Sequence, residues 1–152
     1  MLAPSDPAVR GFLRRSLVVQ MATLSSKLRP FVTPLWFVLH RGVLYITTGP
    51  ESRAGRNIQQ HPEVTLLFSG ERARRHDQVL RLRGVAACHP GLPPWPALLR
   101  IVAKYYLSPR ALRPELRNVS KWRLRALYHG QAKVGAGHIH VLPGDCELLT
   151  RP

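Results

Sequence analysis

The stretch FVTPLWFVLHRGVLYITT, residues 31–48, contains two apolar segments joined by a short polar turn. Residues 31–39 are apolar on both faces of an extended chain, which predicts a strand whose two faces are both covered. The tripeptide His40-Arg41-Gly42 is typical of a tight connection, so residues 43–48 are expected to form the second arm of a hairpin. Pro34 has no N–H to donate to a strand ladder, which predicts a sheet edge or a bulge at this position.

Further strand and helix patterns flank this hairpin. Strand patterns cover residues 17–24, 63–68 and 78–88, and weaker ones cover residues 135–142 and 147–150 around a predicted Pro143-Gly144-Asp145 turn. Helical patterns cover residues 5–15, 53–60, 96–106 and 114–128. Many short strands joined by tight turns predict an antiparallel barrel, mainly β with short helices, formed by one domain over residues 1–152.

The composition is that of a globular protein. The chain has 152 residues, of which 45% are hydrophobic, and no apolar run reaches the roughly 20 residues that a bilayer span needs. Residues 1–7 lack the basic and apolar pattern of a secretion signal, so the expected compartment is the cytoplasm. Cys88 and Cys146 are too few for a disulfide framework and are expected to be small packing residues.

The charge balance is strongly basic. Lys and Arg number 23 against 8 acids, which gives a net charge of +15. One interpretation is a polyanionic partner, such as nucleic acid or an anionic membrane. The other is a composition bias, because 19 of the 23 cations are Arg and Pro is frequent. We expect no membrane partner.

A rival function rests on a basic stripe in the predicted helix 114–128 and just before it. Its cations recur in steps of four, with one further Arg beside them and a Trp available to stack on bases: Arg113, Arg117, Lys121, Arg125, Arg123 and Trp122. Such a stripe predicts a non-enzymatic module that binds nucleic acid or another polyanion.

The segment after the hairpin has the features of a phosphate site. Thr47 and Thr48 place two hydroxyls at the strand tip, and Ser52 can cap the helix predicted over residues 53–60. The first amides of a helix have no intrahelical acceptor and carry a partial positive charge. Arg53 and Arg56 add forked donors, which suit a phosphate monoester.

Together these motifs resemble the flavin-binding split barrel of the pyridoxamine-phosphate-oxidase-like superfamily. The resemblance covers about residues 15–88. It is carried by residues 21–24 (MATL), 29–38 (RPFVTPLWFV), 42–48 (GVLYITT), 52–57 (SRAGRN) and 61–67 (HPEVTLL), followed by Arg83-Gly84-Val85. Order and spacing in combination are specific for the superfamily, but not for one activity within it.

The resemblance implies a six-stranded antiparallel split β-barrel that forms a homodimer and binds FMN or the deazaflavin F420 in a groove between the subunits. It implies an oxidoreductase that acts on a small organic substrate. Carried onto this chain, it places Thr33, Pro34, Leu35 and Trp36 near the ring and Thr47, Thr48, Ser52, Arg53 and Arg56 near the phosphate. Arg81 or Arg83 is expected to add charge within the groove. Relatives usually carry a lysine where this chain has Ala54.

Other candidate chemistry is sparse. His138 and His140 share one side of a predicted strand, with His129 nearby, but no third ligand is evident and no metal site is predicted. Some split-barrel relatives degrade haem with a C-terminal histidine, which makes haem binding a lesser alternative. No catalytic residue stands out, as is typical of proteins in which a flavin carries the hydride.

Overall fold

The computed structural model describes residues 2–69, 78–105 and 137–150. Along the chain these residues form α1 (Pro7–Arg15), β1 (Val18–Leu24), β2 (Pro30–His40), β3 (Val43–Ile46), α2 (Arg53–Gln60), β4 (Glu63–Ser69), β5 (Gln78–Pro90), α3 (Trp95–Tyr105) and β6 (Gly137–Thr150). The predicted helix 114–128, the basic stripe and His129 lie outside the described residues. No helix in the described ranges is both long and apolar enough to cross a bilayer.

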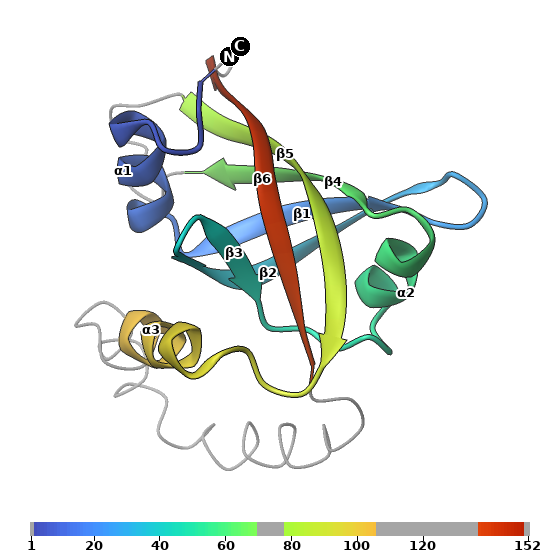
Figure 1. The fold of residues 1–152 in the computed structure, drawn as a ribbon. Helices are drawn as coiled ribbons and strands as arrows, with labels where there is room; N and C mark the ends of the chain where they lie inside the picture. Colours follow the sequence, from blue (N-terminus) through green and yellow to red (C-terminus); the bar gives the residue numbers. More distant parts are fainter. Residues whose placement is uncertain (1, 70–77, 106–136, 151–152) are drawn as a thin grey trace, which may run out of the picture.

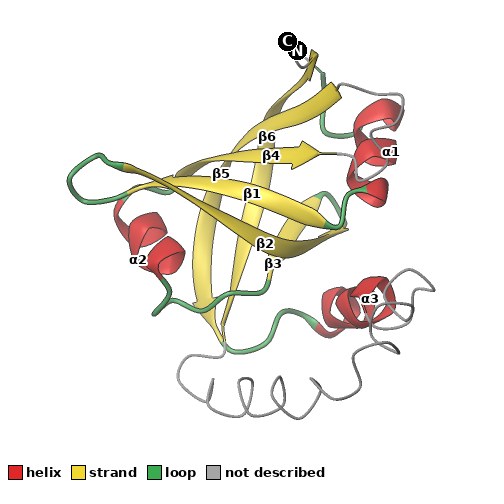
Figure 2. Cartoon of the chain, turned by 180° about the vertical axis from the view of Figure 1, so that it is seen from behind, coloured by secondary structure: helices red, strands yellow, loops and turns green. Residues whose placement is uncertain are grey.

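The six strands form one closed antiparallel barrel in the order β1-β2-β3-β6-β5-β4 (Figures 1 and 2). Pairing of β1 with β4 completes the ring. This confirms the prediction of a mainly β, six-stranded antiparallel barrel with short helices. The longest pair joins β5 to β6, which are far apart in the sequence but lie side by side over almost their whole lengths.

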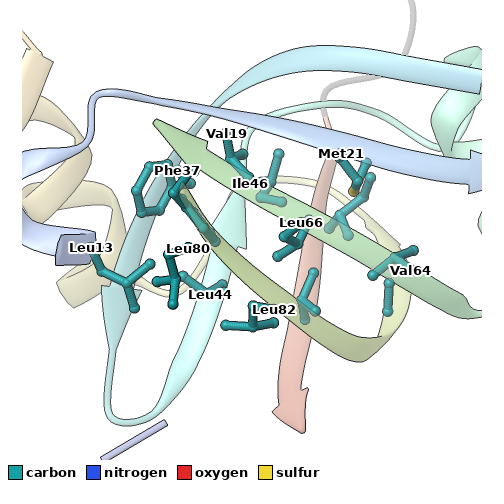
Figure 3. Packing of buried hydrophobic residues seen from close by; sticks show 14 of the residues in the cluster. Leu13, Val19, Met21, Phe37, Leu44, Ile46, Val64, Leu66, Leu80 and Leu82 are labelled. Carbon is teal, nitrogen blue, oxygen red and sulfur yellow. The ribbon is translucent and has the colours of Figure 1, made fainter. Parts of the chain in front are cut away.

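Alternation along the strands builds the core. On β5, Leu80, Leu82 and Ala86 point inward and are buried, while the intervening side chains point outward, as the sequence predicts. Val19 and Met21 of β1 fill the same interior, which Figure 3 shows as a continuous set of apolar side chains. Each fully buried side chain of this size contributes about 1.5–3 kcal/mol through removal from water.

Two helices add side chains to this core. Helix α1 begins at Asp6, whose carboxylate accepts from Ala8 N at 2.8 Å, and it buries Phe12 and Leu13. Helix α2 buries Ala54 and Ile58 in the same core. In Figure 1 the two helices lie on different sides of the barrel.

Helix α3 packs on the outside of the barrel instead. Its buried residues Ala97, Ile101 and Tyr105 form a separate cluster with Val38 of β2. Tyr105 extends the β1–β2 ladder, because its hydroxyl accepts from Phe37 N at 2.9 Å and donates to Leu17 O at 2.6 Å. The helix therefore supplies a hydrogen-bonding partner for β2 at Phe37, just beyond the first residue of β1.

The predicted turn at Pro143-Gly144-Asp145 is wrong. Strand β6 is continuous from Gly137 to Thr150 and does not form two short strands. Leu82 pairs with Cys146 and Gly84 with Pro143, so Gly144 and Asp145 together stand opposite Arg83. The turn-like residues form a β-bulge, which bends a strand without ending it and tolerates a proline.

Smaller differences concern the hairpin. Strand β3 ends at Ile46, two residues before the predicted end, so Thr47 and Thr48 lie in the connection to α2. Residues 30–36 of β2 pair with β1, whereas pairing with β3 starts only at Phe37. Pro34 therefore stands where β2 has a partner on one side, which confirms the predicted sheet edge.

Gly84 yields a stability prediction. A Cβ at this position would lie 2.5 Å from Leu142 O and 2.9 Å from Val141 Cγ1. We expect Gly84→Ala to cost about 1–3 kcal/mol through overpacking, which lowers Tm by about 3–10 °C in a chain of this length. Thermal unfolding followed by circular dichroism measures this shift.

The matched control is Gly11→Ala in α1. A Cβ there meets only the flexible Arg15 guanidinium, at 3.5 Å. Ala is a better helix former than Gly by about 0.5–1 kcal/mol, so this variant should melt slightly above the wild type. Equal Tm changes in the two variants would contradict the crowding argument.

Candidate functional site

The connection from β3 to α2 forms a corner at the surface that carries several hydrogen-bond donors. Ser52 caps α2 by accepting from Gly55 N at 3.0 Å, and this bond leaves its hydroxyl hydrogen for another acceptor. The N–H groups of Arg53 and Ala54 lie in the first turn and have no intrahelical acceptor. We call residues 47–56 the phosphate corner.

Close packing fixes the backbone of the phosphate corner. A Cβ on Gly55 would lie 2.5 Å from Gly49 O and 2.7 Å from Pro50 O. A Cβ on Gly137 of β6 would lie 2.5 Å from Pro50 Cδ. Both positions therefore accept only glycine without local movement, and residues 49–50 are held between α2 and β6. Sequence analysis missed this role, although a glycine inside a helical pattern often signals close packing.

Two arginines of the phosphate corner are exposed. The guanidinium carbon of Arg53 lies 4.7 Å from the centroid of the Phe31 ring, a cation–π contact that orients the side chain. Arg56 Nη1 donates to Glu51 O at 2.6 Å. The Arg53 guanidinium thus lies at the surface beside the start of α2, and Thr47 and Thr48 lie in the connection that precedes the helix.

Ala54 occupies a core position. It is 3% exposed and packs in the main hydrophobic cluster with Ile58. A lysine with the same backbone would have to lead its ammonium group out of the core. In this chain, position 54 therefore serves α2 packing, and the surface charge beside it comes from Arg53.

The predicted ring residues on β2 divide between two faces. Thr33 and Leu35 pair with Met21 and Val19, which point into the core, so both share the inward face. Thr33 Oγ1 is buried and has no hydrogen-bond partner. Pro34 and Trp36 take the opposite, outward face.

Trp36 is already in contact with another aromatic ring. Its indole stacks on Tyr105 of α3 with centroids 4.5 Å apart and planes 7° apart. One indole face is therefore covered by the protein itself. Sequence analysis did not predict this contact, because nothing in the helical pattern of residues 96–106 indicates which strand the helix packs on.

Arg81 is in an ion pair. Its guanidinium contacts the carboxylate of Glu147 directly across the β5–β6 ladder. It also belongs to a row of outward residues that runs through Leu67 and Gln20 to Pro34. Arg81 and Pro34 are therefore on the same side of the sheet, three strand spacings or about 14 Å apart.

A surface hollow of about 620 Å³ lies across this outward side of the sheet. The hollow itself was not predicted from the sequence. Of the residues that the sequence analysis singled out, Arg83 lines it, whereas Arg81 does not. We call the surrounding surface the outer sheet face and define it by Leu24, Val32, Glu63, Arg83, Val85, Leu142 and Asp145, all of them exposed. Three apolar side chains of this face are about half exposed: Val32, Val85 and Leu142, at 53%, 52% and 54%.

Three histidines gather at the end of the β5–β6 pair. His138 and His140 share one side of β6, as predicted, and His89 of β5 joins them, which the sequence analysis missed. Burial, followed by the nearby His89 and His138, lowers the pKa of His140. Within the described part of the chain, no group of three or more His, Cys, Asp or Glu side chains is arranged to hold a metal ion.

The two cysteines have no redox geometry. Cys88 and Cys146 are both free. Burial raises the pKa of each thiol, and Asp145 raises that of Cys146 further. Both therefore stay protonated at neutral pH and act as packing residues.

Comparison with known proteins identifies the family. The family model described as pyridoxamine 5'-phosphate oxidase matches residues 5–126. No curated protein matches the sequence significantly. A structure titled F420 reductase is similar over 91% of this chain and 94% of its own, with 19% identity and a TM-score of 0.61.

Two further solved structures share the fold. An FMN-binding protein related to pyridoxamine 5'-phosphate oxidase from Nostoc punctiforme has 18% identity and a TM-score of 0.60, covering 98% of this chain and 85% of its own. HutZ, described as a heme storage protein from Vibrio cholerae, has 16% identity and a TM-score of 0.56, covering 95% and 93%. At these identities the likeness shows the fold alone, whereas the family model matches most of the sequence. This chain therefore belongs to the pyridoxamine 5'-phosphate oxidase family and has its six-stranded barrel.

Proposed function

We propose that the protein is an oxidoreductase that binds FMN or F420 and acts on a small organic substrate. The observation that carries the proposal is the phosphate corner. There an exposed arginine, free helix amides and three hydroxyl residues lie within one rigid segment of a chain from this family. Proteins of the same fold that bind FMN or are named for F420 support it.

The residues of the phosphate corner fit a phosphate group. Arg53 supplies a permanent charge in a forked geometry, and the amides of Arg53 and Ala54 supply directed donors. The hydroxyls of Ser52, Thr47 and Thr48 complete the set. Arg56 contributes positive charge, although its Nη1 is held by Glu51 O. The corner needs no lysine at position 54.

The ring would lie along β2. The side chains of Pro34 and Trp36 lie on the outward face of β2. Thr33 and Leu35 offer only backbone groups on that face, because their side chains point inward. A bound flavin supplies the hydride acceptor and donor, and the protein supplies position and field. This division of labour matches a site in which no nucleophile or acid–base pair is evident.

A homodimer is part of the proposal, because the cofactor groove expected for this family lies between subunits. We infer that two copies meet through the outer sheet face. Val32 of this face belongs to residues 31–39, whose sequence predicts a strand covered on both sides. In the single chain, however, its side chain is exposed. The face also carries both charge signs, in Arg83 and in Glu63 and Asp145, so a two-fold axis can place opposite charges together.

The rival function depends on residues 113–125 instead. A nucleic-acid module would be colourless after purification, and its affinity for DNA or RNA would fall steeply as salt rises. A flavoprotein would carry a chromophore or quench the fluorescence of added FMN or F420. An absorbance spectrum of the pure protein, with mass spectrometry of any bound molecule, therefore separates the two functions.

The proposed phosphate site leads to a prediction for Arg53. We expect Arg53→Ala to weaken FMN or F420 binding by about 10- to 100-fold, because a charge-assisted hydrogen bond contributes about 1.5–3 kcal/mol. Fluorescence titration measures the Kd. The matched control is Arg14→Ala, an exposed arginine in the last turn of α1. Arg117→Ala tests the basic stripe, and a loss equal to that of Arg53→Ala would contradict the phosphate assignment.

The second prediction concerns assembly. We expect the wild type to sediment at twice the chain mass of 17.1 kDa. Val85→Glu places a charge in the middle of the outer sheet face and should shift the protein to the single-chain mass. Leu92→Glu, at an exposed apolar position just before α3, serves as the control and should remain dimeric. A monomeric wild type, or a Val85→Glu protein that stays dimeric, would rule out this interface.

A further inference from the structure

Three imidazole rings stack at one end of the β5–β6 ladder. His89 and His138 stand directly opposite each other, with ring centroids 5.4 Å apart. His140 lies diagonally across, with its centroid 4.5 Å from that of His89. We call these residues the histidine trio. Two charged imidazoliums at such distances repel each other.

Hydrogen-bond partners are few around the ring nitrogens of His138 and His89. His138 is buried, and its Nδ1 lies 3.1 Å from Gly91 O. Because a carbonyl only accepts, Nδ1 carries the hydrogen, and a second proton would have to enter at Nε2. His89 Nε2 is buried and has no hydrogen-bond partner. The structure therefore offers His89 Nε2 neither a protein acceptor nor contact with solvent.

The described elements around the trio offer little compensating negative charge. Tyr45 of β3 pairs with His140 and has its ring centroid 6.1 Å from that of His138. The loop after β5 contributes the Gly91 carbonyl. No carboxylate in the described ranges is bonded to any of the three rings. The lowered pKa of His140 has burial as its first cause and the two other histidines as the next.

The trio is mechanically joined to the phosphate corner through Gly137. This residue immediately precedes His138, and a Cβ on it would lie 2.5 Å from Pro50 Cδ and 2.8 Å from Gly49 Cα. The same Cβ would lie 2.9 Å from His89 O. The first residues of β6, the last residues of β5 and residues 49–50 therefore form one close-packed unit. Gly49 in turn accepts from Ser52 N at 3.1 Å, which positions the cap of α2.

We propose that the histidine trio is an acid-sensitive latch that holds the phosphate corner in its anion-binding form. With at most one proton on the trio, the ends of β5 and β6 stay paired and residues 49–50 stay wedged against Gly137. A second proton drives the rings apart, separates the strand ends and frees residues 49–52. The anion at the corner rests on the proposed function, whereas the motion of the latch is a property of the chain alone.

The direction of the pH effect follows from the lowered pKa. His140 binds a proton more readily when the rings are apart than in the closed arrangement. The closed form is therefore fully favoured above the ordinary histidine pKa of 6.5. It loses stability as the pH falls below that value, down to the lowered pKa of the closed form.

Hydrogen exchange of the flavin-free protein tests the latch. We compare peptides covering residues 47–60 and 137–142 at about pH 7.5 and about pH 5, correcting for the intrinsic exchange rate. In the wild type we expect protection to fall about tenfold or more at acid pH, since Coulomb repulsion between two imidazoliums this close is strong enough for such a change. Peptides covering residues 18–24 and 63–69 should keep their protection, which excludes global unfolding.

Two variants are examined separately, so that poor folding of one does not decide the outcome. His140→Gln and His89→Gln each remove one imidazole ring from the stack and should reduce the acid loss to about twofold or less. The control His61→Gln changes a histidine outside the trio, at the C-cap of α2. It should behave like the wild type. Equal wild-type protection at both pH values, or an undiminished acid loss in both trio variants, overturns the proposal.

Flavin titration separates this inference from the proposed function. If FMN or F420 binds at about pH 7.5, its Kd should rise at about pH 5 in the wild type more than in His140→Gln. An equal rise in the two proteins counts against control of the corner by the trio. If neither molecule binds at either pH, the cofactor assignment fails, while the exchange measurement still decides whether the latch exists.

Discussion

The long antiparallel pair of β5 and β6 is the part of the barrel on which the other features depend. Its ladder runs from Gln78 and Thr150 to Pro90 and Gly137, and it spans the barrel from one end to the other. The middle of the pair contains the bulge beside Arg83, and one end presses on the connection between β3 and α2. Both the outer sheet face and the phosphate corner are therefore shaped by the same ladder.

The phosphate corner gains its rigidity from small residues rather than from many polar contacts. Gly55 lets α2 approach residues 49–50, and Gly137 lets β6 approach them from the other side. The buried bond from Asn57 Nδ2 to Thr23 Oγ1, at 2.9 Å, attaches α2 to β1. A fixed backbone matters for anion binding, since free amides are useful only when they already point at one position.

The sequence predicted the barrel well because its strand patterns are local. Alternation on β5, the hairpin of β2 and β3 and the cap at Ser52 all depend on neighbours within a few residues. Three features could not be predicted, because they depend on contacts between distant segments. These are the inward side of Thr33 and Leu35, the stacking of Tyr105 on Trp36, and the approach of His89 to β6. The Pro143-Gly144-Asp145 error has the same origin, since only the facing Arg83 distinguishes a bulge from a turn.

The half-partnered segment of β2 bears on how the protein avoids aggregation. Phe37 N points to the β1 side, where it meets Tyr105, so every second residue back from Val38 directs its backbone groups to the open side. Pro30 and Pro34 are two of those residues, and neither has an N–H. A foreign strand that approaches this edge therefore finds interrupted donors and cannot extend the sheet. The two prolines, which weaken a strand, therefore also remove donors that another chain would need to pair with this edge.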